Sequence, residues 1–531
     1  MDGSTANQNQ PSGKNLVNLG PVPELRERGR AVLKVKGRQI ALFETDGKLF
    51  AINNRCPHEG YPLVEGSLKK GCQLACNWHG WTFDLASGKA LQGRDAVKTY
   101  AVTRVRGDIL IDLAPEDPSV LRARAYGELD EALAEHDYDR IARSLARLEA
   151  AGEEVENTLR HVISLSVHRF ERGFGHAFAG LADWLAFSAH SDQATRRVAL
   201  LEAIGHISWD MLMGTDAPLP RLRKRWSAKA CLEALEDMNE EEATAHIRGA
   251  FDEGLGFQAV KPVFEALIFA HYAGFGHPAI YLMKAEQLID ALGQEVAEPL
   301  ALSLARYLCH AAREDLIPEF KGFADYLALE PGFSPVPKVE CLSGQSVRQV
   351  FALTAASNAH VHEMWEALLA ASAMNMLRFD IERQHGIAQP IAQNIGWLDF
   401  THAITFAEAV HFHGGRNAAL WQSGLTQMAA FVGRNAPFLM AEMDEGRFVD
   451  DIQAFLGAQK AKLFNMDEGD YIYAVHRLKM LRATEALLVH VSKPTARLIV
   501  AALNRYLHAR TRQRHPARTA FQAWQTVARE S

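Results

Sequence analysis

Cys56-Pro57-His58-Glu59-Gly60, followed by Cys76-Asn77-Trp78-His79-Gly80, is the stretch that decides how the N-terminal part of this chain folds. Each segment places one thiolate and one imidazole on a short loop, and seventeen residues separate His58 from Cys76. A glycine after each histidine suits a tight turn, because glycine adopts positive φ at no steric cost. The two cysteines can therefore hold one iron while the two histidines hold a second iron.

A structural zinc ion is the alternative for a set of four Cys and His ligands. Zinc-binding segments usually pair Cys with Cys and His with His, whereas both segments here are mixed. Two neutral imidazoles in place of two thiolates leave an iron-sulfur cluster less negative and easier to reduce. The pattern therefore favours a 2Fe-2S cluster that transfers single electrons, with the ligands Cys56, His58, Cys76 and His79.

Residues 20–114 resemble the Rieske ferredoxin family, because the two segments quoted above, the second continuing as Trp81-Thr-Phe83-Asp84, follow its cluster-binding motifs closely. High-potential respiratory members of that family carry an additional disulfide cysteine in each loop. Tyr61 and Trp78 stand at those positions here. The resemblance therefore implies the soluble ferredoxin and oxygenase type.

Length and composition limit the remaining possibilities. A chain of 531 residues suggests two to four domains. A net charge of -7 and a pI of about 6.3 give no reason to expect nucleic-acid or anionic-membrane binding. The sequence shows neither an N-terminal export signal nor an apolar run of about eighteen residues, so we expect a cytoplasmic protein without a membrane span. Six cysteines in so long a chain do not indicate a disulfide framework.

The residue pattern changes along the chain and predicts a multidomain protein, with a small all-β domain before a large all-α domain. Residues 1–19 are rich in Ser, Asn, Gln, Gly and Pro and are expected to be a disordered tail. Residues 20–114 contain short alternating apolar runs with a hairpin signal at Asp46-Gly47. Over 115–531, apolar residues recur at three- and four-residue spacing, and a subdivision at the proline-rich segment 331–337 is left open.

Histidine is concentrated in the predicted helical domain, where 19 of the 22 histidines follow residue 150. Most are expected to be ordinary core or surface residues, but a few could converge on a metal, because helices can present neutral imidazole to a bundle core. Acidic-x-x-His pairs typical of di-iron sites occur three times, about as often as chance gives. The Asp-x-x-His-x4-His element of the usual Rieske oxygenases is not visible, since Ile268 stands where His271 and His277 would need an acid.

A second resemblance concerns the helical half. The segments Leu398-Asp-Phe-Thr-His402-Ala-Ile-Thr-Phe-Ala407, Gly276-His277-Pro278 and Val475-His476-Arg-Leu-Lys479 are similar to the questin-oxidase-like family, an all-helical group that includes enzymes opening anthraquinone-type rings. The resemblance implies a mononuclear non-haem iron with mainly His ligands and a carbamylated lysine. The candidate ligands in this chain are His277, His402, His476 and Lys479, with His161 as a poorer fit.

Simpler explanations exist for these candidates. Lys479 lies in the basic run 477–482, so a solvated lysine is the alternative, and His402 lies in an apolar stretch, so burial without function is the alternative. His476 and Lys479 are three residues apart and would share one helix face, as two ligands of one metal require.

Together these features predict an enzyme, a Rieske-dependent oxidoreductase in which the cluster passes electrons to the non-haem iron for O2-dependent oxidation of a small aromatic or polyketide-like substrate. The chain has no Gly-rich dinucleotide fingerprint, so a separate NAD(P)H-dependent reductase or ferredoxin is expected to supply the electrons. The alternative is a non-catalytic electron carrier whose helical half is a docking module. A homo-oligomer is compatible with either function.

Overall fold

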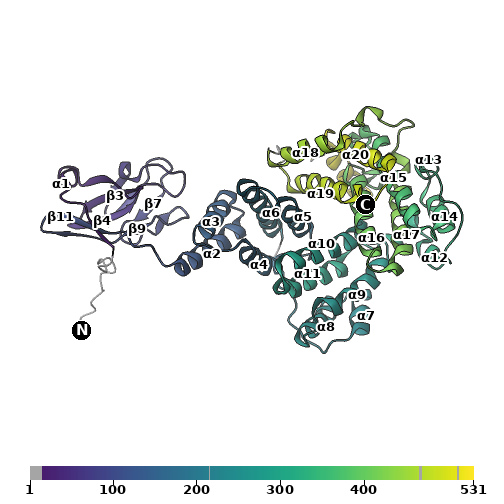
Figure 1. Ribbon diagram of the computed structural model, residues 1–531, viewed down its shortest axis with the longest axis horizontal. Helices are drawn as coiled ribbons and strands as arrows, with labels where there is room; N and C mark the ends of the chain where they lie inside the picture. Colours follow the sequence, from purple (N-terminus) through teal and green to yellow (C-terminus); the bar gives the residue numbers. More distant parts are fainter. Residues whose placement is uncertain (1–14, 215, 466–468, 511–513, 531) are drawn as a thin grey trace. The chain divides into compact units, whose positions relative to one another are not determined.

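The computed structural model describes residues 15–214, 216–465, 469–510 and 514–530 (Figure 1). The chain divides into two compact units, one ending at Glu128 and one comprising Leu129–Ser531. The described part of the first unit up to Asp112 consists mainly of strands, with one short helix and one 3-10 turn, and helices follow from Pro118 onward. The predicted order, a small antiparallel β domain before a large helical domain, is confirmed.

Three antiparallel sheets build the first unit. Their strand orders are β1-β11-β10, β2-β3-β4-β9 and β5-β6-β7-β8. The bounds are β1 (Leu16–Asn18), β2 (Arg30–Val35), β3 (Arg38–Thr45), β4 (Lys48–Asn53), β5 (Ser67–Lys69), β6 (Gln73–Ala75), β7 (Thr82–Asp84), β8 (Ala90–Gln92), β9 (Thr99–Tyr100), β10 (Val102–Val105) and β11 (Asp108–Asp112), with helix α1 (Pro23–Arg28) before β2.

The predicted hairpin at Asp46-Gly47 joins β3 to β4. Thr45 pairs with Lys48, and both turn residues have positive φ, 50° for Asp46 and 69° for Gly47. Two residues with positive φ form the type I′ turn that matches the twist of the flanking strands.

Most of the predicted tail, residues 1–14, lies outside the described residues. Its last part belongs to the β unit instead, because Leu16–Asn18 forms β1 and pairs with β11. Val17 and Leu19 pack against a buried core cluster of this unit. Two apolar side chains in a polar context were enough to add a strand that composition did not predict.

Helices and connecting loops make up the described part of the second unit, together with an isolated β-bridge between Phe379 and Leu439, and helix α2 (Pro118–Glu135) spans the boundary at Glu128. Short 3-10 turns connect many of the helices, and one of them, η2 (Gly274–Gly276), directly precedes α10. The α-helices are α2 (Pro118–Glu135), α3 (Tyr138–Ala150), α4 (Val155–Ser166), α5 (His176–Ser188), α6 (Gln193–Met213), α7 (Ala228–Glu236), α8 (Glu240–Asp252), α9 (Gly256–Ala270), α10 (His277–Leu292), α11 (Ala297–His310), α12 (Phe323–Leu327), α13 (Val339–Leu342), α14 (Val347–Ser357), α15 (Val361–Arg378), α16 (Leu398–Gly414), α17 (Trp421–Arg434), α18 (Ile452–Lys462), α19 (Tyr471–Leu488), α20 (Lys493–Leu507) and α21 (Pro516–Val527).

Four of these helices form a closed ring inside the unit: α5 packs on α10 and α19, and α16 packs on the same two helices (Figure 1). Buried residues run almost without interruption along α5 and α10. A helix that is apolar on every face is stable only in an interior. Polar side chains on these four helices therefore need partners within the ring.

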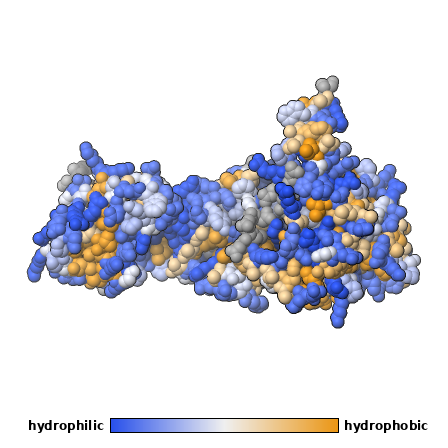
Figure 2. Space-filling view, turned by 90° about the horizontal axis from the view of Figure 1, so that it is seen from above, coloured by the Kyte–Doolittle hydropathy of each residue, from blue (hydrophilic) through white to orange (hydrophobic). Residues whose placement is uncertain are grey.

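The proline-rich segment 331–337 is a loop between α12 and α13, and residues 129–531 stay one compact unit. On the face seen in Figure 2, hydrophilic residues cover most of the surface and apolar residues form smaller patches. None of the helices in the described part of the chain is long and apolar enough to cross a bilayer.

Two leucines of the third sheet give a matched test of the packing in the core of the β unit. Leu74 in β6 is fully buried, whereas Leu91 in β8 is 50% exposed. Leu74→Ala should lower the unfolding free energy of the β unit by about 2–5 kcal/mol, because it leaves a cavity. Leu91→Ala should change it by less than about 0.5 kcal/mol. Urea unfolding followed by β-sheet circular dichroism measures both, and equal effects would contradict this packing.

Candidate metal sites

The two cysteine-histidine loops of the β unit have the same backbone geometry. Cys56 and Cys76 are buried, and each donates its N–H to the carbonyl of the residue five positions later, at 2.9 and 2.7 Å. The N–H groups of Gly60 and Gly80 donate back to the two cysteine carbonyls, at 2.8 and 3.0 Å, and both glycines have φ of 75°. The glycines are therefore needed for the turns, as expected from the sequence.

The side chains of these loops converge as a shared cluster requires. The Nδ1 atoms of His58 and His79 lie 3.1 Å apart, and the ring of His58 stacks on Trp81 with centroids 4.8 Å apart. Burial and the neighbouring Cys76 raise the pKa of Cys56 to about 11. A thiolate at that position therefore needs nearby positive charge, which iron would supply. The residues present fit a 2Fe-2S cluster.

A second group of histidines lies inside the helical ring. His176 and His277 are the first residues of α5 and α10, and His402 and His476 lie in α16 and α19. The Nε2 atom of His277 is 3.1 Å from that of His176 and 2.9 Å from that of His402, which is 3.3 Å from that of His476. Ligand atoms about 2.1 Å from a metal and at right angles to one another lie about 3.0 Å apart.

Hydrogen bonds fix the tautomer of three of these rings. The Nδ1 atoms face backbone carbonyls, which only accept, so each Nδ1 carries the proton and each Nε2 keeps its lone pair. The acceptors are Gly274 O for His277 (2.6 Å), Leu398 O for His402 and Ile472 O for His476 (2.6 Å). Lone pairs at such distances repel one another unless a cation lies between them. This arrangement is the usual support of metal-bound imidazole.

His176 completes the group although the sequence analysis did not select it. Its Nδ1 atom lies 3.2 Å from the hydroxyl of Tyr281, whose pKa burial raises well above its usual value. A signal for it was present: Gly173-Phe-Gly-His176 repeats the motif Gly274-Phe-Gly-His277, and each copy ends at the start of a helix. The motif recurs only once, too rarely for a search for periodic repeats to find it.

Charged residues form a layer on the C-terminal side of the histidines. Each ring helix contributes one: Asp183, Lys284, Glu408 and Lys479. Lys284 Nζ donates to Asp183 Oδ1 at 2.7 Å and lies 4.0 Å from Glu408 Oε1. The amine of Lys479 is buried and has no hydrogen-bond partner among the described residues, and burial lowers its pKa to about 8. The same burial, together with the charge of Lys479, lowers the pKa of His277 to about 3.

Of the residues selected from the sequence, the structure brings together His277, His402, His476 and Lys479 and leaves His161 elsewhere. His161 is in α4, is 35% exposed, and its Nε2 atom lies 2.6 Å from Asp130 Oδ1. His161 was the poorest fit to the resembling family, and its position agrees with this, since α4 is not part of the ring.

The loop before His277 is strained. Gly274, Phe275 and Gly276 all have positive φ, which for Phe275 (55°) is unfavourable. Its N–H donates to both carboxylate oxygens of Glu314 at 3.1 Å, and Arg434 lies 4.2 Å over its ring. The strain holds the Phe275 ring against His402, with centroids 5.0 Å apart.

Known proteins resemble the first unit. A family model for the Rieske [2Fe-2S] domain matches residues 15–103. The 3-phenylpropionate/cinnamic acid dioxygenase ferredoxin subunit of Shigella flexneri serotype 5b is 37% identical over 106 residues, which are 20% of this chain and 99% of that protein. The 4beta-methylsterol monooxygenase of Methylococcus capsulatus is 37% identical over 109 residues, 18% of this chain and 29% of that protein.

A solved structure, the ferredoxin of carbazole 1,9a-dioxygenase from Nocardioides aromaticivorans IC177, is 24% identical, covers 19% of this chain and 100% of its own, and has a TM-score of 0.18. Through residues 15–103 the chain belongs to the Rieske [2Fe-2S] domain family. The sequence matches cover about a fifth of the chain and do not bear on the helical unit, whose likeness to the questin-oxidase-like family stays a prediction.

Metal content tests the histidine group directly. Purified protein should contain about three irons per chain, two in the cluster and one in the helical ring. His402→Ala should reduce this to about two, because it removes a central ligand. His411→Ala changes a histidine on the same helix that lies outside the group, and should leave three. Three irons in His402→Ala, with the cluster intact by EPR, would contradict the site.

Proposed function

We propose that this chain is a Rieske-dependent oxidoreductase. In this proposal, electrons from the 2Fe-2S cluster reach a non-haem iron held by the four histidines, for O2-dependent oxidation of an aromatic or polyketide-like substrate by oxygenation or ring cleavage. The observation that carries the proposal is the inward convergence of Nε2 lone pairs from His277, His402 and His476, each fixed by a backbone carbonyl. Iron in such a site would supply a centre able to react with O2 one electron at a time.

The proposed site is accessible at one side. His402 and His476 are buried, at 4% and 2% exposure, while His176 and His277 are only partly buried. A small substrate would therefore approach past the N-terminal ends of α5 and α10. At helix N-termini, backbone N–H groups and the helix dipole favour negative charge, so these two helix ends would stabilise negative charge that develops on the substrate.

Aromatic side chains next to the histidines favour an apolar, aromatic substrate. Phe275 contacts both His402 and Phe431, with ring centroids 5.0 and 5.2 Å apart, and Phe431 lies 5.2 Å from Phe406. Apolar walls with a few fixed polar groups are typical of small-molecule sites, and they exclude water from the reaction. Tyr281, which is neutral and hydrogen-bonded to His176, could donate a proton from its hydroxyl within this site.

The electron donor is proposed to be a separate NAD(P)H-dependent reductase or a ferredoxin. The His79 side chain, 40% exposed, gives a partner access to the cluster side of the β unit. The β unit is similar to a ferredoxin subunit that, by its name, belongs to a dioxygenase system. Here the acceptor would be the helical part of the same chain.

Paired variants separate electron supply from chemistry. With a chemical or enzymatic reductant, O2 and anthraquinone-type test compounds, wild type should consume O2 in a substrate-dependent manner. Cys56→Ser should lose the cluster EPR signal and repeated turnover, since it removes an iron ligand. His402→Ala should keep the cluster signal and lose O2 consumption, while His411→Ala should keep both.

An oxygen electrode and EPR on the same samples measure these outcomes. Repeated turnover by Cys56→Ser would contradict the role of the cluster, and turnover by His402→Ala would contradict the role of the histidines. Two irons per wild-type chain, without O2 consumption, would favour the alternative of a non-catalytic electron carrier.

Lys479 is proposed to carry a carbamate, whose oxygen would join the histidines as an anionic ligand of the metal. Its ammonium form would repel a metal cation, and its buried nitrogen lacks a partner among the described residues. Bicarbonate labelled with carbon-13 should give a carbamate NMR signal in wild type and in Lys493→Arg, a surface control. Lys479→Arg should lack the signal and retain about two irons per chain. A wild type without the signal would show that Lys479 is unmodified.

A further inference from the structure

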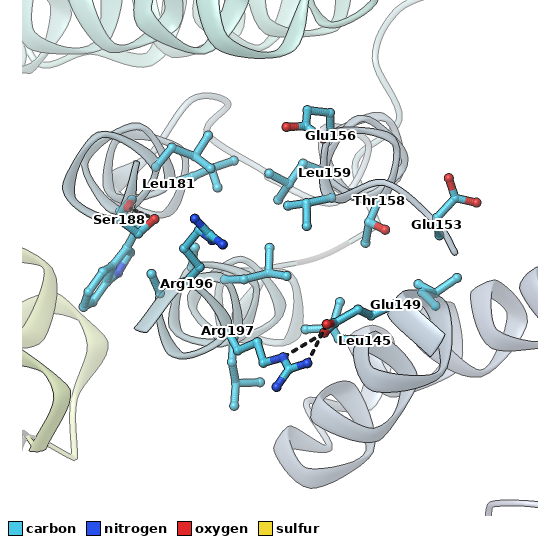
Figure 3. A pocket seen from close by; sticks show the side chains of 18 of the residues that line it. Leu145, Glu149, Glu153, Glu156, Thr158, Leu159, Leu181, Ser188, Arg196 and Arg197 are labelled. Carbon is cyan, nitrogen blue, oxygen red and sulfur yellow. Dashed lines mark hydrogen bonds and ion pairs between the residues drawn. The ribbon is translucent and has the colours of Figure 1, made fainter. Parts of the chain in front are cut away.

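A cavity lies in the helical unit, between α3, α4, α5, α6 and the end of α10, with a volume of about 970 Å³. Its walls are mainly apolar, and Figure 3 shows Leu145, Leu159 and Leu181 pointing toward its interior from three different helices. Four of the lining side chains, Leu148, Leu159, Leu181 and Trp184, are buried. A concave apolar space of this volume is large enough for a drug-sized molecule.

The polar groups in the wall are already satisfied. Ser188 Oγ donates to the carbonyl of Trp184 at 2.8 Å, and Thr158 Oγ1 donates to that of Glu154 at 3.4 Å. Among the described lining residues, no buried polar side-chain atom lacks a partner. An ordered water molecule needs two or more polar partners, so this wall favours an apolar ligand over water.

The cavity is distinct from the histidine group. Leu181, Trp184 and Leu185 line the cavity from α5, whereas His176 and Asp183 of the same helix face the ring of four helices. At 100° per residue these two sets lie on opposite sides of α5. A ligand in the cavity would therefore be separated from the proposed metal site by the width of a helix.

Charges at the rim indicate what kind of molecule fits. Arg197 and Glu149 neutralise each other through two hydrogen bonds, at 2.8 and 2.5 Å (Figure 3). Arg196 donates to the carbonyl of Ser191 at 3.0 Å and makes no hydrogen bond to a carboxylate among the described residues, although its charge helps to lower the pKa of the exposed Asp192. In Figure 3 its side chain extends from α6 toward Leu181, away from Glu149, while Glu153, in the loop before α4, and Glu156, in α4, lie on another side. Arg196 is thus a cation beside an apolar wall.

We propose that this cavity binds an apolar molecule that carries one anionic group, with its body against Leu159, Leu181 and Trp184 and its anion on the guanidinium of Arg196. Aromatic and long-chain carboxylates or sulfonates belong to this class. Arginine matches such groups because its planar fork can donate two parallel hydrogen bonds. The site does not depend on the proposed oxidoreductase function, because it uses no residue of either metal site.

The test uses the full chain with anilinonaphthalene sulfonate, an apolar monoanion whose fluorescence rises in apolar surroundings. Wild type should bind it, decanoate should displace it, and decyltrimethylammonium, with an equal chain and opposite charge, should displace it much less. Arg196→Gln should weaken decanoate binding by about three- to tenfold, as expected for a partly exposed charge-assisted bond. Arg225→Gln, at a side chain 93% exposed outside the cavity, should leave it unchanged.

Two filling variants, Ala142→Phe and Leu200→Phe, place bulk in the cavity from different helices. Each should abolish dye binding while circular dichroism and iron content stay as in wild type, and either one that folds is sufficient. Dye binding that survives in a folded filling variant would overturn the proposal. Equal displacement by the anionic and cationic chains, or no dye binding to wild type, would overturn it as well.

Discussion

The arrangement of the histidines in the helical ring depends on three hydrogen bonds, in which the Nδ1–H groups of His277, His402 and His476 donate to backbone carbonyls. Each bond removes the choice of tautomer and turns an unprotonated Nε2 inward. The Nε2 atom of His402 lies 2.9 Å from that of His277 and 3.3 Å from that of His476, so their lone pairs repel one another without a cation between them. The helices α5, α10, α16 and α19 pack around these Nε2 atoms. A metal bound between them would compensate the repulsion and account for polar side chains in the interior of the ring.

The same four helices carry a second level of organisation. Each contributes one histidine to the group and, further toward its C-terminus, one residue to the charged layer formed by Asp183, Lys284, Glu408 and Lys479. Lys284 and Asp183 form a buried ion pair, which leaves the amine of Lys479 without a hydrogen-bond partner in the described structure. Buried charges are costly unless they are paired, so this amine is the group whose state a bound metal would change most.

Sequence alone predicted the β unit well, and it selected three of the four histidines that converge in the helical ring. The spacing of Cys56, His58, Cys76 and His79 is local, and local spacing is what a sequence displays directly. The ring of four helices joins residues that are more than 70 positions apart, from His176 to His476, and no periodicity reveals such contacts. His176 could have been found through the motif it shares with His277, whereas the exclusion of His161 required knowing that α4 lies outside the ring. The strand at Leu16–Asn18 was missed because its pairing with β11 is equally remote in sequence.

The most direct measurement of the central claim is anomalous X-ray diffraction at the iron absorption edge from crystals of the full chain. Besides the two irons expected between the cysteine-histidine loops, the account predicts one anomalous peak within bonding distance, about 2.1 Å, of the Nε2 atoms of His176, His277, His402 and His476. An ordered helical ring with its four histidines in place and no peak between them, in crystals whose cluster is occupied, would contradict it.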